Sequence, residues 1–305
     1  MSFFLIYTSN LEKVLKTKGF AVTAEIGPPK GCDAEQIKAK ANLLINCADA
    51  FNITDNQTGV VRLSSLGGSV ILLDMGLEPI MQMACRDRNR IALQSDVLGA
   101  CAVGVRNILF ITGDHQCFGN HPGARGVFDL DSIQLIKVVK DMRDHGVFQS
   151  GDEIKFGRPN VFIGGAANPF ADPLSFRVDR LEKKIFAGVD FIQTQSVFNL
   201  ERFNCWMDEV RSRGLDKKVF ILAGVTPLKS LKMCERMKFH VPGVDIPNVI
   251  YNRMKNTNDP KKEGFDISLE LIKEIKKIKG VSGVHITALF WENIIPSLVS
   301  KAGLL

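Results

Sequence analysis

Long hydrophobic runs are missing from this sequence of 305 residues. The longest apolar stretches, such as 70–73 and 219–225, are far shorter than the roughly 20 residues that a membrane-spanning helix needs. The opening MSFFLIYTSN is apolar, but it lacks the basic start and the small-residue cleavage site of a secretion signal. We therefore expect a cytoplasmic protein with no membrane-spanning segment.

Cysteine pairs and common catalytic motifs are also missing. The seven cysteines are an odd number and include no C-x-x-C pair, which indicates buried free thiols in a reducing compartment. The sequence has no G-x-S-x-G element, P-loop or H-E-x-x-H pair, and this argues against the common hydrolases and nucleoside triphosphatases. Asp114, His115, Cys117 and His121 are close in sequence, but their spacing matches no standard zinc site, so no metal is expected.

Clusters of basic residues beside aromatic ones are absent, although the net charge is +6. Because the basic residues are scattered, we expect no nucleic-acid partner, while the positive charge mildly favours anionic ligands. With 45% hydrophobic and 24% charged residues, the composition is that of a globular protein rather than a disordered or coiled-coil one.

The sequence does contain a regular alternation of short apolar runs with helical patterns. Strands are predicted at 21–26, 50–54, 79–84, 107–112, 160–164, 191–194, 219–223 and 283–289. Helices are predicted at 33–46, 64–75, 89–103, 131–144, 173–186, 200–212 and 293–301, and less regularly over 229–279, with a short helix at 248–255. The strand runs are continuously apolar, as in a parallel sheet that is buried on both faces.

Eight such units predict a single (β/α)8 barrel over residues 1–305. The alternative is a doubly wound open sheet, which needs a Gly-rich dinucleotide turn after its first strand, and GPPKG is not such a turn. Two segments, 114–126 and 241–264, are longer than usual connections and are candidate lids or partner surfaces.

Chemistry in this fold occurs at the carboxyl ends of the strands. Glu25 lies inside the first apolar strand, where burial would raise its pKa toward the value that a general acid needs near neutral pH. The other strand ends supply mainly amides, hydroxyls and small residues, with Asp114 as a second carboxylate. We expect few cations there, which argues against phosphosugar chemistry and favours a neutral or mildly anionic heterocycle.

Seven of these segments, taken in order, resemble the methylenetetrahydrofolate reductase family. They are AEIGPP at 24–29, NITDN at 52–56, TGD at 112–114, GAANP at 165–169, KKIFAGVDFIQTQ at 183–195, AGVTPL at 223–228 and GVHITAL at 283–289. The resemblance implies a (β/α)8 barrel with a flavin at its C-terminal mouth, usually FAD, with FMN possible. It also implies the reduction of 5,10-methylenetetrahydrofolate to 5-methyltetrahydrofolate.

The resemblance assigns roles to individual residues. Glu25 matches the general acid that protonates the bridging nitrogen and opens the five-membered ring, before reduced flavin delivers hydride to the one-carbon unit. Asp114 matches a second catalytic carboxylate, beside the isoalloxazine, that tunes the flavin and helps to hold the pterin. Gln195 and Thr226 match further substrate-binding positions. The implied flavin-binding positions are Asn52, Thr54, Gln82, Ile111, Thr112, Gly113, Asp114, Phe128, Ala166, Asn168, Lys183 and Lys184, the two lysines suiting a pyrophosphate.

Some positions depart from the commoner bacterial pattern. Gln82 and Asp172 stand where His is frequent, Thr112 where Arg is frequent, and Asn168 where an aromatic residue often covers the flavin. Because of these changes, the sequence leaves open whether the flavin is FAD or FMN. It also leaves open how NAD(P)H would dock.

The resemblance implies a short form without the C-terminal regulatory domain of eukaryotic members, similar to the short subunits of acetogen-type systems. The electron source implied is NAD(P)H or a partner subunit with a zinc or iron–sulfur centre, and a homo-oligomer is possible. Two alternatives stay open: a folate-dependent methyltransferase barrel without a redox step, and a scaffold subunit of a larger complex.

Overall fold

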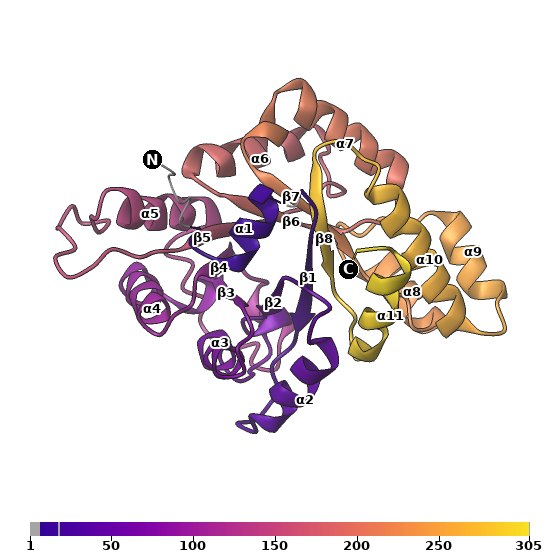
Figure 1. Ribbon diagram of the computed structural model, residues 1–305, viewed down its shortest axis with the longest axis horizontal. Coiled ribbons are helices and arrows are strands. Elements are labelled where there is room, and N and C mark those ends of the chain that lie inside the picture. Colours follow the sequence, from indigo (N-terminus) through magenta and orange to yellow (C-terminus); the bar gives the residue numbers. More distant parts are fainter. Residues whose placement is uncertain (1–6, 18, 305) are drawn as a thin grey trace.

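The computed structural model describes residues 7–17 and 19–304, and its centre is a closed barrel of parallel strands (Figure 1). The strands are β1 (Ala21–Ile26), β2 (Ala50–Ile53), β3 (Pro79–Ala84), β4 (Asn107–Ile111), β5 (Phe162–Ala167), β6 (Phe191–Ser196), β7 (Phe220–Val225) and β8 (Val281–Ile286). Each strand pairs with the next along the chain, and β8 closes on β1. The predicted (β/α)8 barrel is confirmed, and the open sheet is excluded.

Helices surround the barrel and bury their apolar faces against the outside of the strands (Figure 1). They are α2 (Glu35–Leu44), α3 (Ser65–Asp74), α4 (Arg90–Ala102), α5 (Ser132–Asp144), α6 (Ser175–Ala187), α7 (Leu200–Ser212), α8 (Leu231–His240), α9 (Asn248–Asn256), α10 (Pro260–Ile275) and α11 (Ile295–Lys301). The main core lies between this ring and the strands.

The irregular stretch 229–279 resolves into α8, α9 and α10. The charged segment 256–264 is only partly a turn, because the Asp259 side chain caps α10 by accepting from the backbone N–H of Lys262, and Pro260 occupies the first turn. The predicted short helix at 248–255 is confirmed as α9.

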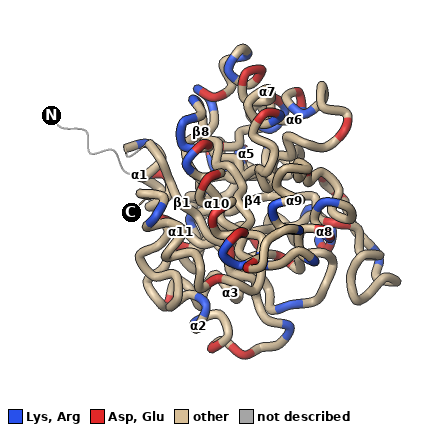
Figure 2. The backbone as a smooth tube through the Cα atoms, turned by 90° about the vertical axis from the view of Figure 1, so that its right-hand side faces the viewer, with Lys and Arg blue, Asp and Glu red and all other residues tan. Residues whose placement is uncertain are grey.

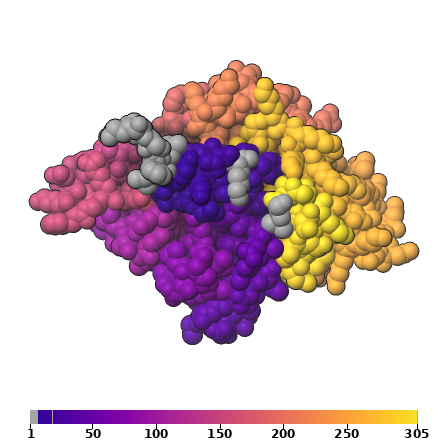
Figure 3. Space-filling view, in the orientation of Figure 1, coloured from indigo at the N-terminus to yellow at the C-terminus, as the bar shows by residue number. Residues whose placement is uncertain are grey.

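A helix that the sequence pattern did not reveal, α1 (Asn10–Thr17), closes the amino-terminal end of the barrel. Its Leu11, Val14 and Leu15 pack against side chains from the amino-terminal half of the barrel, among them Phe162. The Glu78 carboxylate accepts hydrogen bonds from the backbone N–H groups of Asn10 and Leu11 at 2.6 and 2.8 Å. Figure 3 shows α1, in indigo, in the middle of the face in view. The apolar opening, residues 1–6, lies outside the described residues.

The segment 114–126 is irregular, as expected, with one short 3-10 turn at Gln116–Phe118. It lies against the turn Gln57–Gly59 that follows β2. A Cβ atom on Gly119 would lie 1.8 Å from the carbonyl oxygen of Gly59, so only glycine fits at this contact.

Positions of Lys and Arg are intermixed with positions of Asp and Glu along the backbone (Figure 2). Within residues 7–17 and 19–304, no helix is long and apolar enough to cross a bilayer. All seven cysteines are free, but the expectation that they are buried is wrong for Cys32, Cys117 and Cys205. Cys32 and Cys117 lie in loops, and Cys205 lies outside the buried stripe of α7.

Candidate active site at the barrel mouth

A cavity of about 1230 Å³ opens at the carboxyl ends of the strands, at the opposite end of the barrel from α1. Its walls combine residues from the strand ends with side chains from α6, α8 and the segment after β8. Eight of the residues predicted for the site line it: Glu25, Gln82, Ile111, Ala166, Asn168, Lys184, Gln195 and Thr226.

The other predicted site residues lie outside this lining. Asn52 and Thr54 are buried at the end of β2, where Thr54 donates to Gln57 Oε1 at 2.7 Å. Thr112 hydrogen-bonds to Ser132 after β4, and Gly113 takes a positive φ of 91° that favours glycine.

The remaining three are exposed. Asp114 begins the 114–126 segment, and its carbonyl oxygen accepts from the buried Arg86 guanidinium at 3.1 Å. Phe128 stacks on His115, with ring centroids 6.5 Å apart. Lys183 lies on the outer side of α6, above the ring of Phe176. In the described part of the chain, no three His, Cys, Asp or Glu side chains gather as a metal site would need.

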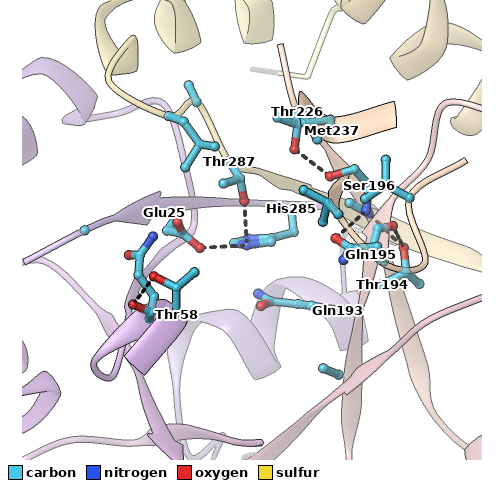
Figure 4. Close-up of a pocket in the computed structure, with 18 of the residues that line it drawn as sticks. Glu25, Thr58, Gln193, Thr194, Gln195, Ser196, Thr226, Met237, His285 and Thr287 are labelled. Carbon is cyan, nitrogen blue, oxygen red and sulfur yellow. Dashed lines mark hydrogen bonds and ion pairs between the residues drawn. The ribbon is translucent and has the colours of Figure 1, made fainter. Parts of the chain in front are cut away.

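Two carboxylates line the cavity, Glu292 from the segment after β8 and Glu25 from β1, and Glu25 lies among the strand-end side chains (Figure 4). Its side chain is 15% exposed, and burial raises its pKa from an ordinary 4.5 to about 7. The nearby carboxylate of Glu292 pushes the pKa in the same direction, while Lys40 and Arg62 oppose it. A carboxyl group with a pKa near 7 is protonated in about half of the molecules at neutral pH and can readily give its proton up, as a general acid must.

The groups around Glu25 are held by the backbone after β1. Lys40 Nζ donates to the carbonyl oxygen of Gly27 at 3.0 Å and lies 3.4 Å from Glu292 Oε1. The Arg62 guanidinium donates to the carbonyl oxygen of Pro28 at 2.9 Å. The run Gly27–Pro28 that follows Glu25 therefore anchors the two cations that limit how far its pKa rises.

The expectation of few cations at the mouth is wrong. Lysine and arginine side chains line the cavity on several sides: Lys30, Lys40, Arg62, Arg177, Arg180, Lys184, Lys229, Lys232 and Arg236. They come from helices and loops and not from the strand ends that the prediction considered. The cations of α6 and α8 could have been found from the sequence, because they are spaced three and four residues apart. Residues with this spacing share one face of a helix.

Lys184 is the buried member of this group. Its amino group donates to the carbonyl oxygen of Ala166 at the end of β5. Burial, with a smaller effect from the neighbouring Arg180, lowers the pKa of Lys184 to about 8. A lysine desolvated in this way gains from any anion that approaches it.

Hydroxyl and amide groups form the wall at β6 and β7 (Figure 4). The hydroxyls of Ser196 and Thr226 are 2.6 Å apart, and Thr194 Oγ1 accepts from the backbone N–H of Gly224 at 2.9 Å. The Gln195 side-chain oxygen accepts from the N–H of Ser196 at 3.1 Å. These bonds fix the neutral groups of the cavity wall.

The donor set of the cavity fits a flavin. Amides of Gln82 and Gln195 can pair with the polar edge of a ring system, and the small Ala166 leaves room beside them. Arg180 and the buried Lys184 can hold phosphate oxygens.

Comparison with known proteins places this chain in a family. The family described as methylenetetrahydrofolate reductase matches residues 10–303. Methylenetetrahydrofolate reductase 1 of Schizosaccharomyces pombe is 24% identical over 245 residues, which cover 78% of this chain and 38% of that protein. The 5,10-methylenetetrahydrofolate reductase of Salmonella typhimurium is 22% identical over 214 residues, covering 69% and 65%. The chain thus spans less than two thirds of the length of these relatives.

A solved structure has the same fold. An uncharacterized protein from Clostridium thermocellum, described as binding two copies of 5-methyl-5,6,7,8-tetrahydrofolic acid, superposes with a TM-score of 0.71 at 16% identity. The superposition covers 97% of this chain and all of that one. Because the family match extends over residues 10–303 and so over the whole barrel, the chain belongs to the methylenetetrahydrofolate reductase family.

Proposed function

We propose that this protein reduces 5,10-methylenetetrahydrofolate to 5-methyltetrahydrofolate with Glu25 as the general acid. Membership of the family and the folate ligands of the Clostridium thermocellum protein support the substrate class. The observation that carries the proposal is the buried Glu25 carboxyl, which lines the cavity and has a pKa of about 7.

The residues of the chain would act on the folate before it is reduced. Glu25 protonates the bridging nitrogen, and this opens the five-membered ring to an iminium ion at the one-carbon unit. Gln195 and Thr226 hold the pterin on the neutral wall. The cations on α6 and α8 attract the carboxylates of the folate. Burial of Glu25 keeps water from taking the proton instead.

A flavin, FAD or FMN, would supply the two electrons for this reduction. Arg180 and Lys184 would hold its phosphate oxygens, with Gln82, Ala166 and Asn168 nearer the ring system. Asp114 remains a predicted flavin neighbour at the start of the 114–126 segment. The electron donor, NAD(P)H or a partner subunit with a zinc or iron–sulfur centre, and a cytoplasmic location also remain predictions.

Glu25→Gln tests the role of the acid. The variant keeps the shape of the side chain and removes its proton, so it should bind flavin and accept electrons from a reductant. Oxidation of the reduced flavin by methylenetetrahydrofolate should slow by at least about 100-fold, which is the usual contribution of a general acid. Stopped-flow absorbance measures the two half-reactions separately.

The matched control is Glu35→Gln, at an exposed position on α2, which should behave as the unmodified protein. Loss of both half-reactions in Glu25→Gln would assign Glu25 a structural role. Full retention of both would contradict the proposed mechanism.

Lys184→Gln and Lys183→Gln test the assignment of the phosphate site. The two neighbours differ in placement, because Lys184 is buried at the cavity wall and Lys183 is exposed outside it. Loss of one hydrogen bond to a charged group should weaken flavin binding about 10- to 100-fold in Lys184→Gln. Lys183→Gln should leave the Kd unchanged, as measured by fluorescence quenching of the flavin. Equal effects of the two substitutions would contradict the assignment.

A further inference from the structure

A chain of buried polar side chains crosses the barrel below Glu25 and ends at His285. Gln193 of β6 and Asn52 of β2 face each other across the barrel and exchange hydrogen bonds. Asn52 Nδ2 donates to Gln193 Oε1 at 2.7 Å, and Gln193 Nε2 donates to Asn52 Oδ1 at 2.9 Å. The second N–H of Gln193 donates to Thr23 Oγ1 at 3.1 Å. The position of each Gln193 proton is thereby fixed.

Thr23 links Gln193 to His285. The two residues are register partners on β1 and β8, and Thr23 Oγ1 lies 3.0 Å from His285 Nδ1. This hydroxyl has a single proton to give, and of the two acceptors within reach His285 Nδ1 at 3.0 Å is nearer than the Val284 carbonyl oxygen at 3.4 Å. His285 Nδ1 therefore accepts, and the ring proton is on Nε2.

The Nε2 side of the ring faces Glu25 (Figure 4). Nε2 is 4.0 Å from Glu25 Oε2 and 3.3 Å from Thr287 Oγ1. His285 is only 7% exposed, and burial lowers its pKa to about 4, which agrees with a neutral ring. The charged groups that act on Glu25 are Glu292, Lys40 and Arg62, so a neutral imidazole adds no cation to them.

We propose that His285 is a positioning residue for Glu25. It is a neutral imidazole with its proton fixed on Nε2 by Thr23. Its N–H lies at Thr287 Oγ1, the hydrogen-bond partner, with Glu25 Oε2 4.0 Å away, so the ring holds the carboxyl group of Glu25 in place without accepting its proton. The role rests on the proposed function of Glu25 as an acid. It explains why the polar side chains of Asn52, Gln193 and Thr23 are buried at the floor of the cavity.

Nitrogen-15 NMR of the ligand-free protein, labelled in its histidines, tests the assignment directly. The chain has five histidines, and the signals missing in His285→Gln identify those of His285. We expect an unprotonated Nδ1 and a protonated Nε2 that do not change between pH 5 and 8. A proton on Nδ1, or a doubly protonated ring near neutral pH, would overturn the proposal.

Thr23→Val removes the hydroxyl at nearly constant volume, and Thr23→Ser retains it. In Thr23→Val both tautomers should be populated, and the form with a free Nε2 draws the acid proton toward the ring. The pKa of Glu25 should therefore rise. Infrared difference spectra against Glu25→Gln measure it as the pH at which half of the carboxyl C=O band is lost. The folate half-reaction should slow about tenfold, the effect of one misplaced hydrogen bond.

Thr23→Ser and the exposed control Thr17→Val should match the unmodified protein in all three measurements. An unchanged tautomer in a folded Thr23→Val protein would overturn the proposal. Because the NMR measurement needs neither flavin nor folate, a failure of the proposed function leaves it interpretable. The expected tautomer together with a fully active Glu25→Gln variant would contradict the function and not the tautomer.

Discussion

Glu25 is a buried carboxyl group, and its ionised form lowers the free energy of unfolding relative to its protonated form. Its pKa is about 7 in the fold against an ordinary 4.5, so between these values the folded state holds a proton that the unfolded state has lost. Stability conferred by the protonated form therefore falls as the pH rises through this window, and the loss is complete above about pH 7.

Glu25→Gln should remove this pH dependence. The 2.5-unit difference implied by the two pKa values corresponds to about 3 kcal/mol at pH 8. We expect the free energy of unfolding of the variant, relative to the unmodified protein, to rise by up to that amount between pH 5 and pH 8. Urea unfolding at several pH values measures it, with Glu35→Gln as the control. A constant difference across this range would show that Glu25 is not buried as an acid.

Among the individual residues of the site, the sequence predicted only some. Glu25 was identifiable because a carboxylate in an apolar strand is unusual, and period two places it on the inner face. Burial is the main cause of the raised pKa of Glu25. The charged groups that adjust it further, Glu292, Lys40 and Arg62, are distant in sequence, and only the closed fold brings them together. Gln193 and Asn52 bond across the barrel, a pairing that no spacing along the chain reveals.

Among the elements, the strands were the most predictable part of the fold. Their continuous apolar runs located all eight, and the largest differences in their bounds are at the ends of β5, β6, β7 and β8. The helix α1 was not predicted because it is only eight residues long and its apolar side faces the barrel end, not a neighbouring helix. The cations of α6 and α8 were missed because the prediction considered strand ends only.

Leu11→Ala tests the role of α1 as the closure of the barrel. Leu11 is fully buried in the cluster at the amino-terminal end of the barrel, so truncation should leave a cavity there. We expect a loss of about 2–5 kcal/mol in the free energy of unfolding, measured with urea. Lys13→Ala, an exposed position on the same helix, should change it by less than about 0.5 kcal/mol. Equal effects of the two substitutions would contradict this packing.

In the whole molecule, one end of the barrel is packed and contributes to stability, and the other end holds the candidate active site. One end is closed by α1 and an apolar cluster, whereas the other opens into a cavity with cations, amides and the carboxyl group of Glu25, whose pKa is raised. This division is usual for a (β/α)8 barrel. The cationic mouth and the neutral wall of β6 and β7 together suit a ligand that joins a heterocycle to an anionic tail.

The visible spectrum of the purified protein tests the central claim most directly. After reconstitution with FAD or FMN, we expect flavin absorbance that anaerobic NADH or an artificial reductant bleaches and that methylenetetrahydrofolate then restores. Bleaching by NADH would identify a self-sufficient reductase, and bleaching only by the artificial reductant would indicate that a partner supplies electrons. Failure to bind flavin, or bleached flavin that the folate does not restore, would contradict the proposed reductase.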